Sequence, residues 1–193
     1  MTKPEAKLQS LLEPTVVTKE AKKVIELESP SPLYVTVFKQ AEMYNKAYLM
    51  LKSSMDQNNV LDLISPMLMN LCFSIELLLK AFVLSEHAWI HSYTELASRG
   101  VNIRGHKYSD LFIIIKDKHR KSILVELSEN LKIPSIDDST FKRILVSQNC
   151  DNSFAEWRYI FEETQIKSLN TELLIILNDV LGKQLFQLIK LTK

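Results

Sequence analysis

The chain has little of what makes tight turns or covalent cross-links. Its 193 residues include 3 glycines, 6 prolines and 2 cysteines. No glycine-rich phosphate-binding loop occurs, and so few turn residues argue against a fold made of many short turns. Cys72 and Cys150 stand far apart, so they form neither a disulfide framework nor a zinc-binding spacing. This composition predicts long helices in a reducing compartment, and hence a cytoplasmic protein.

An excess of one charge is also missing. Lys and Arg total 24 and Asp and Glu total 23, which gives a net charge of +1. The overall charge therefore gives no reason to expect binding to nucleic acid or to a membrane surface. One local run, residues 116–121, is basic. We interpret it as a solvated helix end, with a patch that contacts phosphate as the alternative.

No apolar run of membrane-spanning length is without charge. The longest one, residues 61–84, is interrupted by three charged side chains and by Pro66. Such interruptions argue against a membrane span. Residues 1–5 also lack the basic start and apolar continuation of a signal peptide. We therefore expect no membrane partner.

Apolar residues recur every three or four positions along most of the chain, which predicts helices. We expect an N-terminal arm over residues 1–31 and a helical domain over residues 32–193. The fold class is all-α: an antiparallel, up-and-down helical bundle in which short helices cover one end. The expected helices cover residues 32–57, 66–84, 109–115, 120–131, 137–146, 154–162 and 169–188, and an extension of the second one to residue 93 is the alternative.

Local signals place several helix starts. Ser65 followed by Pro66 is typical of an N-cap and a first helical position. Ser109 is expected to cap the next short helix, and Asp137 to start a later one. Residues 113–115 are three isoleucines that suit a strand by propensity, but the cap and the flanking charges favour a helix.

Residues 70–80 form the most informative segment, because an almost wholly apolar helix there carries two charges. Glu76 and Lys80 lie one turn apart and share a helix face. Burying an unpaired charge is costly, so both groups need partners. His106 and Arg158 are the candidates. The purely structural alternative is a salt-bridge network that fixes helix packing and binds no ligand.

His106 and Arg158 also have functional interpretations. A histidine can orient a loop or titrate as an acid or base near neutral pH. The guanidinium of Arg158 suits a bidentate contact with Glu76 or, equally, with a phosphate. Glu162 follows Arg158 by one turn of the same predicted helix. We therefore name Glu76, Lys80, Arg158 and Glu162 as candidate ligand-binding residues, and His106 and Arg158 as candidate catalytic residues.

Three segments in this order resemble the HEPN (higher eukaryotes and prokaryotes nucleotide-binding) superfamily. They are residues 70–80, residues 105–112 (GHKYSDLF) and residues 154–162 (FAEWRYIFE). The resemblance runs from Pro32 to the C-terminus. It implies an up-and-down helical bundle that is frequently a homodimer. Members are often toxins, RNases or parts of anti-phage defence systems, and others are non-catalytic binding modules.

The chain departs from the catalytic HEPN pattern. Catalytic members carry an arginine followed about one turn later by a histidine, at a metal-independent RNase site in the dimer interface. Here Glu162 stands where that histidine is expected, and the pair Arg99 and His106 matches only by chance. Whether the protein is an enzyme is left open.

Three functions follow as hypotheses. The first is a homodimeric module that binds a nucleotide, an RNA or a protein partner, within a toxin or defence system. The second is a metal-independent RNase or toxin that uses His106 and Arg158. The third is a bundle with no ligand. His87 and His91 have a zinc-compatible spacing but no third ligand, so we expect no metal and no cofactor.

Overall fold

The computed structural model describes residues 31–58, 61–87, 90–158 and 168–191, and these ranges contain helices and no strand. The all-α prediction is therefore confirmed. The predicted arm, residues 1–31, lies almost entirely outside the described ranges. The elements are α3 (Leu33–Asn58), η1 (Leu61–Leu63), α4 (Ile64–Ser85), α5 (Tyr93–Ser98), α6 (Tyr108–Ile113), α7 (Asp117–Leu131), α8 (Asp138–Ser147), α9 (Ser153–Arg158) and α10 (Thr171–Leu191).

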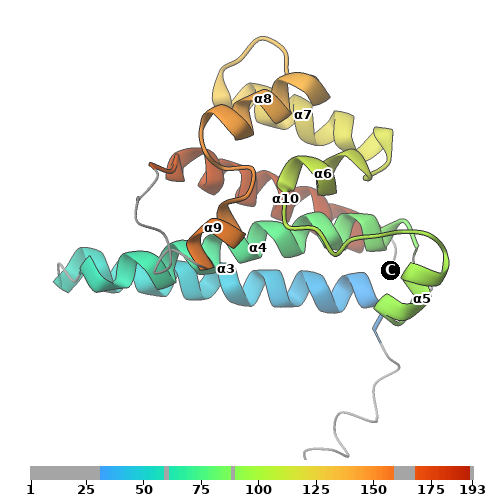
Figure 1. Cartoon of the computed structure of the whole chain (residues 1–193), viewed down its shortest axis with the longest axis horizontal. Helices are drawn as coiled ribbons and strands as arrows, with labels where there is room; N and C mark the ends of the chain where they lie inside the picture. The colour runs from blue at the N-terminus through green and yellow to red at the C-terminus, as the bar shows by residue number, and fades with distance from the viewer. Residues whose placement is uncertain (1–30, 59–60, 88–89, 159–167, 192–193) are drawn as a thin grey trace, which may run out of the picture. The chain divides into compact units, whose positions relative to one another are not determined.

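Helix α4 is the central element of the bundle. It runs antiparallel to α3 as one arm of a long hairpin, and α10, α6 and α9 pack against its other sides (Figure 1). This central position explains why its residues are apolar all round. Helix α4 is long and apolar enough to cross a membrane, but 78% of its most apolar window is buried inside the bundle. Length and hydropathy are therefore weak evidence for a membrane span.

Two helices start differently from the sequence prediction. The N-cap of α4 is Leu63, not Ser65, because the short helix η1 leads directly into α4. Pro66 then lies within the first helical turn, where its missing N–H has no intrahelical acceptor to lose. The N-cap of α6 is Lys107, and Ser109 does not cap it. The prediction for α4 failed because η1 continues into this helix, and the prediction for α6 failed because a distant residue sets its start.

The start of α6 is capped by Asp151, which lies far along the chain. Its carboxylate accepts hydrogen bonds from Ser109 N at 2.7 Å and from Ser109 Oγ at 3.0 Å. The carbonyl of Asp151 accepts a third bond from Tyr108 N at 2.8 Å. A negative charge at a helix N-terminus is favourable, so Asp151 ties the segment before α9 to α6. These contacts fix helix α6, and with it the end of the loop that leads into this helix.

The basic run, residues 116–121, falls at the start of α7, which begins at Asp117 and not at Arg120 as expected. Arg120 has a side chain only 15% exposed and pairs with Asp138 of α8 at 3.1 Å. Its guanidinium also donates to the carbonyls of Ile113 and Ile115, which close the end of α6. Residues 113–115 are therefore a helix end and not a strand. Arg120 is a structural clamp between α6, α7 and α8.

Candidate functional site

Glu76 is a buried carboxylate at the middle of α4. Its side chain is 1% exposed, and each of its oxygens has a partner. Lys80 Nζ donates to Oε1 at 2.6 Å, from one turn further along the same helix. His106 Nδ1 lies 3.0 Å from Oε2. The structure thus brings together three of the predicted site residues, and it satisfies the buried charge as its burial requires.

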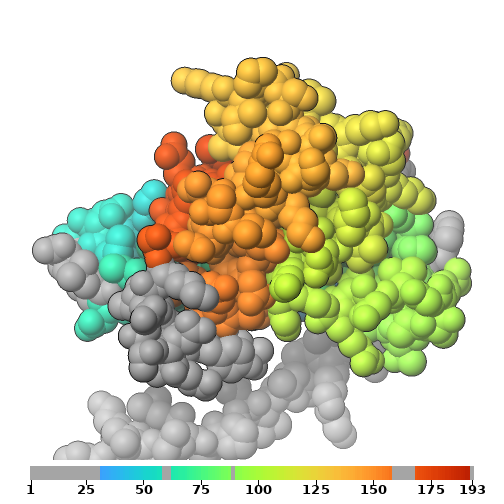
Figure 2. All heavy atoms as spheres, turned by 45° about the horizontal axis from the view of Figure 1, so that its top comes forward, coloured from blue at the N-terminus to red at the C-terminus, as the bar shows by residue number. Residues whose placement is uncertain are grey.

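His106 reaches Glu76 from the loop between α5 and α6. Its ring is 44% exposed and lies tilted against the ring of Phe154 in α9, with centroids 5.6 Å apart. Phe154 in turn stacks on Phe73 of α4 at 4.7 Å. The ring of His106, which contacts Glu76, is thus part of a row of aromatic rings that joins the loop to α9 and α4. In Figure 2 the loop and α6 lie beside α8 and α9 on one face of the molecule.

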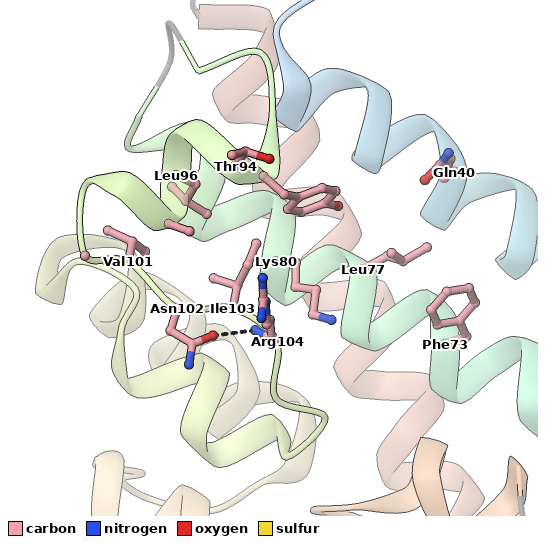
Figure 3. Close-up of a pocket in the computed structure, with 13 residues that line it drawn as sticks. Gln40, Phe73, Leu77, Lys80, Thr94, Leu96, Val101, Asn102, Ile103 and Arg104 are labelled. Atoms are coloured by element: carbon pink, nitrogen blue, oxygen red, sulfur yellow. Dashed lines mark hydrogen bonds between the residues drawn. The ribbon is translucent and has the colours of Figure 1, made fainter.

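Lys80 faces a groove with a volume of about 730 Å³. The groove lies between α4, α5 and the loop after α5, and Figure 3 shows Lys80 of α4 and Arg104 of the loop among the side chains that line it. Arg104 stands on the loop side. Its backbone N–H donates to Asn102 Oδ1 at 3.0 Å, and its side chain pairs with no described residue. The lining residues are Gln40, Phe73, Leu77, Lys80, Tyr93, Thr94, Leu96, Ala97 and residues 100–104.

The charge of this groove sets it apart. The described residues that line it include two cations and no carboxylate. Three other hollows in the described part of the chain each contain at least two carboxylates. Among the described residues, Lys80 pairs with the carboxylate of Glu76, which does not itself line the groove. Burial and the negative charge of Glu76 together raise the pKa of Tyr93 on the opposite wall.

Helix α5 was not predicted, although a local signal for it exists. Ser92 accepts a hydrogen bond from Glu95 N at 3.2 Å, and the Glu95 carboxylate reaches back to His91 N at 3.2 Å. The S-x-x-E pattern over residues 92–95 is a capping box that would have located this helix. Gly100 then turns the chain with φ of +78°, a conformation that favours glycine. This turn directs the loop, and with it Arg104 and His106, back toward α4.

The other predicted site residues have different outcomes. Arg158 ends α9, but its side chain lies outside the described residues, and so does Glu162. Their expected contacts stay predictions. Arg104 was missed because an arginine in a loop gives no periodic signal. Among the described residues, no group of three or more His, Cys, Asp and Glu could hold a metal ion, and His87 and His91 belong to no such group.

No family model, curated protein or solved structure matches this chain.

These side chains could bind an anion, and they could orient a histidine for acid–base chemistry. Lys80 and Arg104 can hold an anion between them, one as a point charge and the other as a planar fork. Glu76 can fix the ring of His106 through Nδ1, and Nε2 has no partner among the described residues. A carboxylate that holds one ring nitrogen leaves the other available as an acid or base.

Proposed function

We propose that this chain is a HEPN-like helical protein whose groove binds a phosphate-bearing ligand, a nucleotide or an RNA. The observation that carries this proposal is the charge of the groove: Lys80 lies on α4, Arg104 lies on the loop after α5, and none of the described lining residues is a carboxylate. Its volume of about 730 Å³ is in the range of small-ligand sites.

Each wall has a role in this proposal. Arg104 binds phosphate oxygens in a bidentate manner, and the ammonium of Lys80 is a second hydrogen-bond donor for them. Phe73 and Tyr93 offer ring faces or edges to a base. Glu76 positions Lys80 through the 2.6 Å contact. Arg104 thus takes the phosphate-binding role that the sequence suggested for Arg158.

Charge reversal tests this proposal. Binding of fluorescently labelled ATP and of a short single-stranded RNA is measured for the wild-type protein, Arg104→Glu and Arg143→Glu. Arg143 is an exposed arginine of α8 that does not line the groove, so it is the matched control. We expect Arg104→Glu to weaken binding by about tenfold or more, and Arg143→Glu to leave it unchanged. Equal binding by the two variants, or no binding by the wild type, would contradict the proposal.

The contact between Glu76 and His106 favours a second candidate, a metal-independent RNase. The histidine would act as acid or base, and an arginine, Arg104 or Arg158, would stabilise the charge that develops on phosphorus. Purified protein is incubated with total RNA in the presence of a chelator. Cleavage that His106→Ala abolishes would support this candidate, and intact RNA after incubation with the wild type would remove it.

The resemblance also leads us to propose the setting of this activity. We propose a cytoplasmic homodimer that acts within a toxin or defence system. Light scattering of the purified protein tests the dimer, and a monomer at all accessible concentrations would contradict it. Expression in bacterial cells tests the toxin role: growth arrest would support it, and normal growth would contradict it.

A further inference from the structure

Glu76 is one negative charge shared between two groups that can both be cations. Lys80 is an ammonium, and an imidazole such as that of His106 can be neutral or carry a second ring proton. With His106 neutral, Glu76 and Lys80 cancel, and Arg104 alone leaves the site with one net positive charge. With His106 protonated, the four side chains carry two net positive charges. The net charge of the site therefore depends on one proton of His106, a residue that does not line the groove.

We propose that the groove prefers a phosphate monoester, with two negative charges, to a phosphodiester, with one, and that binding a monoester places a proton on His106. This inference rests on the proposed function and names its ligand class. A dianion is matched by the doubly positive state, while a monoanion is matched by the state with neutral His106. Linkage then requires that the dianion binds more tightly when the proton is present.

The contacts explain how His106 acts without touching the ligand. Glu76 is 1% exposed, so its charge is weakly screened and is felt by both of its partners. When protonated His106 takes the carboxylate charge through Oε2, the charge of Lys80 is no longer cancelled and can act on the ligand. His106 is therefore a positioning residue for ligand selection, working through a buried carboxylate that joins the loop to α4.

Carboxyl, ammonium, guanidinium and phenol groups ordinarily ionise well outside pH 7 to 8.5. The thiol of Cys72 in α4 also ionises outside this range, because burial raises its pKa to about 11. His106 contacts α4 and α9, whose other described titratable side chains besides Glu76 and Lys80 are Cys72 and Glu156. Arg104 and Lys107 lie on its own loop, and Tyr93 of α5 feels the charge of Glu76.

The test compares a matched pair of ligands. Adenosine 5′-monophosphate and its phosphate O-methyl ester differ by one methyl group and one charge, and so do the guanosine compounds. Affinities are measured by calorimetry at pH 7.0 and pH 8.5, where the monoester is a dianion because its second ionisation lies near pH 6. We expect the monoester to bind about tenfold more tightly at pH 7.0. This preference should fall at least about threefold by pH 8.5.

His106→Gln separates the selection effect from simple binding. In this variant the preference should fall to about twofold or less and its pH dependence should vanish, while affinity for the ester stays close to that of the wild type. The heat of monoester binding to the wild-type protein should also vary with the ionisation heat of the buffer, because a proton is taken up. That measurement needs no variant.

The outcomes are distinct. Equal binding of the monoester and the ester by the wild type, or the same preference in His106→Gln, would overturn this inference and leave the proposed function standing. Binding of neither compound of either pair would count against the proposed function and against this inference with it.

Discussion

His106 Nδ1 lies 3.0 Å from Glu76 Oε2, although the two residues are 30 positions apart and belong to different elements. The contact joins the loop after α5 to the middle of the central helix. Because Lys80 occupies the other oxygen of the same carboxylate, the loop and the groove wall share one buried charge. Both the stability of the bundle and the charge of the groove depend on that carboxylate.

Glu76→Ala should destabilise the protein strongly. The change removes both contacts and leaves the ammonium of Lys80, 13% exposed, without its partner. Breaking one member of a buried ion pair costs about 3–5 kcal/mol. Urea denaturation followed by circular dichroism measures the free energy of unfolding. Glu42→Ala, at an exposed position of α3, is the control and should change it by less than about 0.5 kcal/mol. Equal changes in the free energy of unfolding for the two variants would show that the contacts of Glu76 with Lys80 and His106 do not stabilise the fold.

Replacing both charges should recover most of that loss. In Glu76→Leu with Lys80→Met no buried charge is left unpaired, and apolar side chains of similar size can fill the same space. We expect the free energy of unfolding of the double variant to lie within about 1–2 kcal/mol of the wild-type value, measured by the same urea denaturation. A double variant as unstable as Glu76→Ala would mean that the ion pair itself holds α4 in place. If the double variant is stable but binds no nucleotide, the charges serve function rather than folding.

Acid should weaken the cap of α8. Asp137 accepts hydrogen bonds from Thr140 N at 2.7 Å and from Ser139 Oγ at 2.9 Å, and these lower its pKa to about 2. A carboxyl with a depressed pKa stabilises the fold above its unfolded value of 3.8 and loses that contribution as the pH falls toward 2. The difference in unfolding free energy between the wild type and Asp137→Ala should therefore be constant above pH 5 and shrink between pH 4 and pH 2. A difference that is independent of pH would contradict this account.

Both thiols should be unreactive in the folded protein. Cys72 and Cys150 are buried, and burial raises their pKa values to about 11 and about 12. The native state thus favours the protonated thiols, so their contribution to stability is lost as the pH rises above about 9. We expect a thiol-specific dye at pH 8 to label neither cysteine in buffer and both in urea. Rapid labelling in buffer would contradict the burial of Cys72 in the core.

The sequence predicted the bundle and the meeting of Glu76, Lys80 and His106 because strong physical constraints act on those residues. A helix as apolar as α4 has to be central, and a charge within it has to be paired. The helix start near Ser65 was wrong because η1 continues directly into α4, and the start near Ser109 was wrong because Asp151, 42 positions away, decides it. Local propensity does not report such contacts.

The groove itself could not be predicted in the same way. Arg104 belongs to it only because Gly100 and the capping box of α5 bring the loop back to α4. Neither the direction of a loop nor the absence of carboxylates from a surface has a periodic signature in the sequence. The capping box at Ser92 was a usable signal, and the position of Arg104 two residues before His106 was not.

The measurement that tests the central claim most directly is an NMR titration of the isotopically labelled protein with adenosine 5′-monophosphate and with a short RNA. If the groove is the binding site, backbone amide shifts should change in residues 73–80 and 93–106 and stay unchanged in α7 and α8. Shifts confined to α7 and α8, or no shift with any of these ligands at millimolar concentration, would contradict the assignment of the site to Lys80 and Arg104.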